Sequence, residues 1–176
     1  MQLLNIHHRA NETERLMAAE RHGMLQYACY RLGNLEEAED AVQDVLVKVY
    51  QRRSEGEAEI GNLSAYLYRA LANVCVSRLR EIERTPTVPL DSVPEPIASE
   101  DEDFEHEFRR INRLLAEIPD AQAEVIRLRY YGDKSFREIA DILGITLTTA
   151  KSRFTYGMEK IKRGMLTISQ FDDFTI

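Results

Sequence analysis

A cluster of cationic and hydroxyl side chains near the end of the chain has residue types suited to binding nucleic acid. Lysine and arginine suit phosphate contacts, whereas hydroxyls can also bond to base edges in a major groove. Between 151 and 163 the only acid is Glu159. The cationic and hydroxyl residues of this segment are Lys151, Ser152, Arg153, Thr155, Tyr156, Lys160, Lys162 and Arg163. We therefore expect a DNA-binding helix here.

The residues just before this cluster predict a helix-turn-helix that positions it. Ser135 and Glu138 have the spacing of a capping box, in which each side chain bonds a backbone amide of the other residue. Ala140 is small enough for two helices to approach, Gly144 permits a left-handed turn, and Ile145 fills the space between the helices. An ordinary pair of solvated amphipathic helices is the weaker alternative, because capping box, turn glycine and basic second helix occur together.

Hydrophobic periodicity predicts helices along most of the remaining chain. The first half is expected to hold helices over 12–31, 38–50 and 63–84. The second half is expected to hold helices over 108–118, 120–131, 136–143 and, starting after Thr146 or Thr148, to about 164.

Charge is unevenly distributed along the chain. The net charge of −7 argues against nucleic acid, but residues 85–107 hold eight acidic residues and no lysine or arginine. The rest has 22 acidic and 23 basic residues and is nearly neutral. Four of the five prolines lie in the same segment. Because proline blocks helix and like charges oppose collapse, we predict an extended acidic linker between two domains.

Enzymatic and membrane functions find little support in the sequence. There is no P-loop, dinucleotide-binding glycine turn, HExxH or nucleophile elbow, so we expect no catalytic residue and no cofactor. Cys29 and Cys75 are too few for a zinc site or disulfide framework and are expected to be buried thiols. His7 and His8 are adjacent and do not suit a metal site. Without a long apolar run or a secretory signal, we expect a cytoplasmic protein with no membrane insertion.

Fragments of both halves resemble extracytoplasmic-function (ECF) sigma factors, the smallest sort of bacterial sigma factor. Region 4 of that family resembles, in this order, Leu115–Pro119, Glu124–Tyr130, Ser135–Ala140, Gly144–Ile145 and Lys151–Arg153. Region 2 resembles Ala38–Asp44 and Tyr66–Asn73. The resemblance covers most of residues 15–166. It implies a non-catalytic subunit that binds core RNA polymerase and directs promoter recognition and transcription initiation.

The resemblance to region 4 implies that the last helix docks in the major groove of the −35 promoter element. On that analogy Arg129 and Arg153 help to hold phosphates. The side chains that face bases and backbone are Lys151, Ser152, Thr155 and Tyr156. The predicted DNA contacts of this half are Arg129, Lys151, Ser152, Arg153, Thr155, Tyr156 and Lys160.

The resemblance to region 2 implies contacts with the −10 element and with the polymerase. The predicted DNA contacts are Tyr66, Arg69 and Asn73, and Asn73 matches the asparagine of a helix that lines a captured-base pocket. The preceding loop, about 54–62, would receive the flipped base. From the residues alone, Tyr66 and Tyr68 each either stack on an unpaired base or pack in the core.

The expected protein partners also follow from the resemblance. Asp40, Gln43 and Asp44 match the place where the family meets the coiled coil of the polymerase β′ subunit. The partners implied are core RNA polymerase, through its β′ and β subunits, promoter DNA, and an anti-sigma factor of the kind that restrains many members.

We therefore predict an all-α protein of two small helical domains. The boundaries are a region 2-like domain at 1–84, an acidic proline-rich linker at 85–107, a region 4-like helix-turn-helix domain at 108–169 and a tail at 170–176. One alternative is a stand-alone helix-turn-helix regulator, which tight operator binding without polymerase would favour. Another is a helical protein-interaction adaptor, which unchanged activity after neutralising Lys151 and Arg153 would favour.

Overall fold

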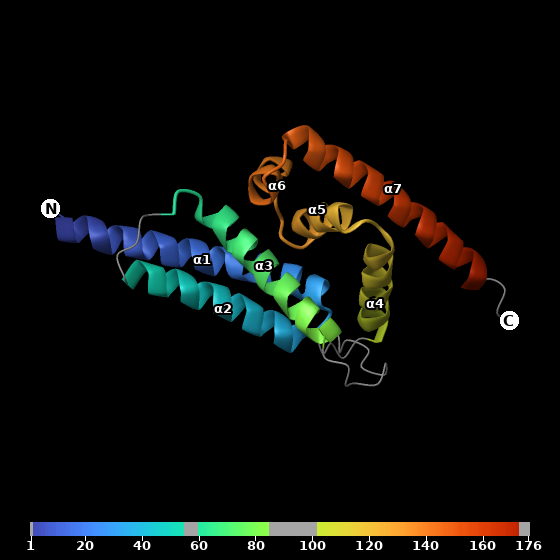
Figure 1. The fold of residues 1–176 in the computed structure, drawn as a ribbon, viewed down its shortest axis with the longest axis horizontal. Coiled ribbons are helices and arrows are strands. Elements are labelled where there is room, and N and C mark those ends of the chain that lie inside the picture. The colour runs from blue at the N-terminus through green and yellow to red at the C-terminus, as the bar shows by residue number, and fades with distance from the viewer. Residues whose placement is uncertain (1, 55–59, 85–101, 173–176) are drawn as a thin grey trace. The chain divides into compact units, whose positions relative to one another are not determined.

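The described part of the chain is helical throughout its regular structure, in two compact units. In the computed structural model, residues 2–54, 60–84 and 102–172 are described, and they form seven α-helices and no strand (Figure 1). The first unit spans Met1–Val93 and the second Pro94–Ile176. The predicted all-α fold class with two helical domains is confirmed.

The first unit is a three-helix bundle. It consists of α1 (Gln2–Leu32), α2 (Leu35–Ser54) and α3 (Leu63–Arg84), each of which contacts the other two. The helices α1 and α2 form an antiparallel pair, which α3 covers (Figure 1). Its largest fully buried side chains are Met24, Tyr27, Val45, Val49, Leu67, Tyr68 and Leu71. This apolar interior orients the opposite, polar faces of α2 and α3 towards solvent.

Side-chain caps determine where α2 and α3 begin. Gly33 has a φ of 74°, and its amide donates to the Cys29 carbonyl, which ends α1. The Asn34 side chain then accepts from the Glu37 amide at 2.9 Å. Asn62 does the same for the Ala65 amide at 3.0 Å. Each asparagine satisfies an amide that the helix itself leaves unpaired.

The second unit has four helices. They are α4 (Glu102–Glu117), α5 (Asp120–Tyr130), α6 (Phe136–Leu143) and α7 (Leu147–Asp172). One cluster of buried residues joins α4 and α5 around Leu115, Ile118, Ala123 and Ile126. Phe154, Met158 and Ile161 of α7 pack against it, so one face of α7 is held and the other is left exposed.

The helix-turn-helix has the local geometry expected from its residues. The capping box at Ser135 and Glu138 is present in both directions. Gly144 adopts the left-handed conformation with a φ of 63°, and the Ile145 amide donates to the Ala140 carbonyl at 3.0 Å. Thr146 caps α7, because its hydroxyl accepts from the Thr149 amide at 3.1 Å. Of the two predicted caps, Thr146 and Thr148, the structure therefore has Thr146.

Four helices extend beyond their predicted ends, among them α2, which spans Leu35–Ser54 rather than 38–50. The helix expected from 12 begins at Gln2, and the one expected to end near 164 continues to Asp172. Gly164 is a point of close packing rather than a stop, since a Cβ there would lie 2.8 Å from Leu114 Cδ2 of α4. The helix expected from Phe108 begins at Glu102, inside the predicted linker.

The remainder of the predicted linker, 85–101, lies outside the described residues. The hydrophobic periodicity over 38–50 predicts that Tyr50 ends the buried stripe of α2, but Tyr50 is 49% exposed. It lies about 100° around the helix from Val49, beyond the half-buried Leu46, and therefore leaves the buried face.

Candidate functional site

Four of the seven DNA contacts predicted for the second half lie on the exposed side of α7. Lys151, Thr155 and Lys160 are exposed, and Tyr156 is 59% exposed despite its aromatic ring. The Thr155 hydroxyl donates to the Lys151 carbonyl at 3.1 Å. This face combines two ammonium groups with a phenol and a hydroxyl, which suits contacts to phosphates and to groove edges.

Ser152 and Arg153 are less exposed than the other predicted contacts on α7. Both are half-buried, and the Ser152 hydroxyl donates to the Thr149 carbonyl at 3.1 Å. The serine oxygen retains its acceptor capacity, because only its proton is used in that bond. Their predicted roles as DNA contacts stay predictions.

Arg129 is tied to the turn between α5 and α6. Its guanidinium donates to the Lys134 carbonyl at 3.0 Å and lies 5.5 Å from the centre of the Phe136 ring. Phe136 and Tyr130 both contact the ring of Phe154 on α7, at centroid distances of 5.2 and 5.9 Å. Arg129 therefore helps to hold the helix-turn-helix together, and its predicted phosphate contact stays a prediction.

The capping box changes the pKa of Glu138 in the second unit. The hydrogen bond from the Ser135 hydroxyl is the main cause that lowers the pKa of Glu138, and burial opposes it. The Ser135 amide and the cations Lys134 and Arg129 lower the pKa further, each by less. The Glu138 carboxylate accepts from the Ser135 hydroxyl at 2.6 Å and from its amide at 2.8 Å. Glu138 is thus ionised while it stabilises the start of α6.

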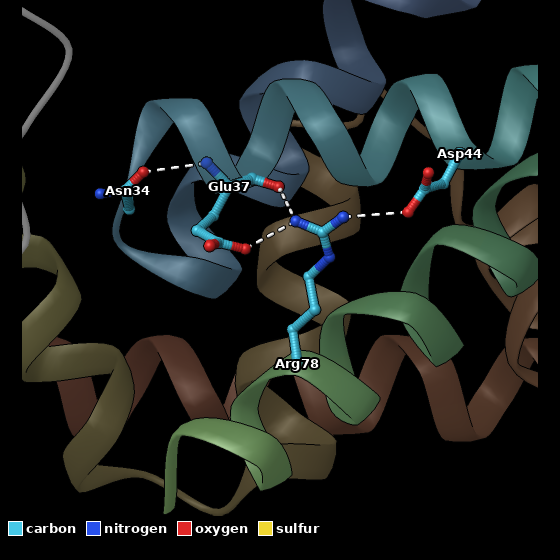
Figure 2. A network of polar contacts seen from close by, with 4 residues as sticks. All are labelled: Asn34, Glu37, Asp44 and Arg78. Carbon is cyan, nitrogen blue, oxygen red and sulfur yellow. Dashed lines mark hydrogen bonds and ion pairs between the residues drawn. The ribbon is translucent and has the colours of Figure 1, made fainter. Parts of the chain in front are cut away.

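In the first unit, the predicted polymerase contacts share the exposed side of α2. Asp40, Gln43 and Asp44 are all exposed, and they lie within about one helical turn of one another. Asp44 differs from the other two because its carboxylate accepts from Arg78 of α3 at 2.9 Å (Figure 2). The sequence did not predict this pairing, because Arg78 lies 34 residues away along the chain.

The predicted base contacts of the first unit lie on α3. Arg69 and Asn73 are exposed and one turn apart. Tyr66 is half-buried; the Arg52 guanidinium lies 5.3 Å from its ring centre and donates to its hydroxyl at 3.2 Å. Tyr68 is fully buried and contacts Tyr27 edge to face, which decides the open choice for Tyr68 in favour of the core.

Asn73 and Asp44 line one open groove between α2 and α3. It encloses about 730 Å³ and is also lined by Lys48, Ser77 and Arg78. The groove brings a predicted DNA contact and a predicted polymerase contact to one surface. Most of the loop predicted to receive a flipped base, 55–59, lies outside the described residues.

The described residues contain two buried thiols and no cluster of metal-binding side chains. Cys29 and Cys75 are both buried and free, and burial raises the pKa of Cys29 to about 11. No group of three or more histidine, cysteine or carboxylate side chains in the described ranges is arranged to hold a metal ion. Among the described helices, none is long and apolar enough to cross a membrane.

Two family models match the chain in sequence order. The model for sigma-70 region 2 matches residues 16–85, and the model for sigma-70 region 4 matches residues 114–163. Together they account for more than half of the chain, and each falls within one structural unit.

Curated proteins similar to the chain are ECF RNA polymerase sigma factors. SigW of Bacillus subtilis is 29% identical over 151 residues, which cover 77% of this chain and 79% of SigW. RpoE of Cereibacter sphaeroides is 26% identical over 131 residues, which cover 73% of this chain and 72% of RpoE.

Two solved structures share the fold. The sigma factor RpoE of Bartonella quintana, in complex with the anti-sigma factor NepR, is 25% identical with a TM-score of 0.61. That alignment covers 88% of this chain and 94% of RpoE. CnrH, in complex with the cytosolic domain of CnrY, is 19% identical with a TM-score of 0.67 and supports the fold alone. It covers 88% of this chain and 87% of CnrH.

Proposed function

The chain belongs to the ECF sigma factors of the sigma-70 family, and we propose that its two helical units divide promoter recognition between them. As a sigma factor it binds core RNA polymerase and directs the enzyme to promoters. The observation that carries this function is the ordered match of region 2 and region 4 to two separate units.

In the second unit, α7 is the proposed reader of the −35 element. Lys151, Thr155 and Tyr156 would contact the groove, with Ser152 and Lys160 beside them. Their exposure supports this assignment, because the opposite face of α7 is packed on the core and cannot reach DNA. Arg129 and Arg153 would hold phosphates at the edges of the contact, where cations position the protein without reading sequence.

In the first unit, α2 is the proposed polymerase-binding helix and α3 is the proposed DNA-binding helix. Asp40, Gln43 and Asp44 of α2 would bind the coiled coil of β′. The exposed carboxylates of the two aspartates suit a basic partner surface. On α3, Arg69 and Asn73 would contact the −10 element. Tyr66 retains a partly exposed ring that Arg52 holds in place, an arrangement suited to stacking on an unpaired base.

The remaining assignments concern regulation, cellular location and domain boundaries. We propose a non-catalytic cytoplasmic protein that an anti-sigma factor restrains, because the Bartonella quintana relative is bound by such a protein. The domain boundaries proposed are 1–84, 85–107 and 108–169, followed by a tail at 170–176.

Run-off transcription tests this function directly. Core polymerase would be mixed with genomic DNA fragments, with and without the purified chain, and transcript ends would be sequenced. We expect new, defined start sites only when the chain is present. The start sites would also yield the promoter consensus.

Binding measurements separate the alternatives. Failure of the chain to bind core polymerase at micromolar concentration, with no inhibitor present, would contradict the function. Tight, sequence-selective binding of the chain alone to DNA, with no effect on polymerase, would instead indicate a stand-alone regulator. A sigma factor should bind DNA poorly alone, because few of each unit's cations are proposed DNA contacts and the acidic segment 85–107 repels phosphates.

A further inference from the structure

A cross-helix ion cluster connects the proposed polymerase face of α2 to α3. Arg78 of α3 donates from Nη1 to the Glu37 carboxylate at 2.6 Å and to the Glu37 carbonyl at 3.0 Å. From Nη2 it donates to the Asp44 carboxylate at 2.9 Å. Figure 2 shows the guanidinium between these two residues of α2, with Asn34 bonded to the amide of Glu37.

The guanidinium of the cluster is shielded from solvent, whereas its two carboxylates are more exposed. The Arg78 side chain is 19% exposed, although its partners Glu37 and Asp44 are 47% and 56% exposed. Burial by itself lowers the pKa of Arg78, but the hydrogen bonds and charges of Glu37 and Asp44 outweigh it and raise the pKa above its ordinary value. Arg78 is therefore charged at every physiological pH, and its planar fork can hold two partners at once.

The position of the cluster connects two predicted contact surfaces. Asp44 is one of the three proposed polymerase contacts, and Arg78 lies one to two turns from Asn73, a proposed base contact, on the same helix. Arg78, Asp44 and Asn73 line the same groove. The polymerase contacts of α2 and the DNA contacts of α3 can be engaged at the same time only if the two helices keep a fixed position relative to each other.

We propose that Arg78 is a positioning residue: it holds Glu37 and Asp44 of α2 against α3, so that the polymerase-binding carboxylates are presented in one fixed arrangement. The proposal rests on the proposed function, because it concerns the polymerase-contact face. On this view Asp44 acts in binding through the cluster, whereas Asp40, which lies outside the cluster, acts independently.

A double-mutant cycle on binding to core polymerase tests the proposal with the full chain. Arg78→Gln should weaken binding by about tenfold, the size of a coupled, partly buried ion pair. Arg80→Gln is the matched control: it removes the same charge two residues along α3, from an exposed side chain outside the cluster, and should change binding by less than about twofold.

The cycle distinguishes positioning from a general loss of structure. In the Arg78→Gln background, Asp44→Asn should have little further effect, whereas Asp40→Asn should weaken binding by the same factor in both backgrounds. Arg78→Lys keeps the charge but not the fork, and should give intermediate binding. Circular dichroism and thermal unfolding of each variant show whether the bundle is intact.

Several outcomes would overturn the proposal. Wild-type affinity in Arg78→Gln with a lowered melting temperature would make Arg78 purely structural. Independent, multiplying effects of Arg78 and Asp44 would show that they do not act as a unit. If the wild-type chain itself does not bind core polymerase, the proposed function fails first, and this proposal fails with it.

Discussion

Single polar side chains in this protein often serve the fold and a predicted contact at once. Arg129 holds the turn before α6, Asp44 holds Arg78, and Tyr66 is engaged by Arg52. Lys151 differs, because its side chain is exposed at the start of the presented face of α7. Its loss should therefore affect DNA binding without affecting stability.

We expect Lys151→Gln to weaken promoter binding by the sigma–polymerase complex by about three- to tenfold, because a phosphate-contact cation is lost. The slope of the logarithm of the binding constant against the logarithm of the salt concentration should decrease in magnitude by about one, because one fewer counterion is released. Arg113→Gln, the same charge change on an exposed residue of α4, is the control and should leave binding unchanged. Equal losses in the two variants would mean that net charge, rather than the α7 face, governs binding.

The capping serine gives a prediction at the same scale. Ser135→Ala should lower the free energy of unfolding of the second unit by about 1 kcal/mol at neutral pH, because an amide of α6 loses its partner. Ser135→Thr keeps the hydroxyl and should cost much less. Urea unfolding monitored by circular dichroism measures both variants.

The same bond predicts a pH dependence. The folded-state pKa of Glu138 lies below its ordinary value of 4.5, so its stabilising contribution is complete above pH 4.5 and is lost as the pH falls through the folded pKa. The Ser135→Ala variant should lose less stability than wild type over that acidic range. A difference between the two proteins that is independent of pH would exclude the Glu138 contribution.

At the scale of elements, α7 has one face to bind and one face to pack. Two glycines on the packed face allow close approach: a Cβ at Gly157 would lie 2.7 Å from Ile126 Cδ1 and 3.2 Å from Gln122 Cβ, and Gly164 meets Leu114. These contacts set how far α7 stands from α5 and α4. The orientation of the DNA-binding face depends on that spacing.

Gly157→Val should therefore destabilise the second unit by about 1–3 kcal/mol, through overpacking against α5. Thermal unfolding measures the cost. Gly61→Val, at a glycine with no atom within 4 Å of its added Cβ, should change stability by less than about 0.5 kcal/mol. A neutral Gly157→Val would show that α5 and α7 can separate freely, contrary to their close contact.

At the scale of the whole molecule, the chain combines two units with separate interiors. Unit boundaries at Val93 and Pro94 fall inside the acidic, proline-rich segment. Linking two weak DNA contacts makes the second one intramolecular and raises the affinity of the pair. Neither unit alone should therefore direct transcription.

Fragments 1–93 and 94–176 should each fold into a helical unit with its own cooperative unfolding, because each has its own core. Mixed in trans, they should support run-off transcription at less than about one hundredth of the intact chain, since the effective concentration supplied by the linker is lost. Circular dichroism and the transcription assay measure the two parts. Full activity in trans would show that the linker contributes no coupling.

The sequence alone determined those features that depend on residues within a few positions of one another. The capping box at Ser135 and Glu138, the left-handed turn at Gly144 and the amphipathic helices follow from local hydrogen bonding and periodicity. The order of the two sigma-like regions was likewise readable from local motifs. Local rules are sufficient there because the interacting groups are held close by the backbone itself.

Only the tertiary structure decided features that bring distant segments together. The cluster of Arg78 with Glu37 and Asp44 joins residues more than 30 positions apart, and Gly164 packs on Leu114 across 50 positions. The burial of Tyr68 against Tyr27, while Tyr66 stays partly exposed, depends on how α3 rests on α1. Such pairings follow from which faces of folded helices meet, and neither spacing nor residue type along the chain encodes that choice.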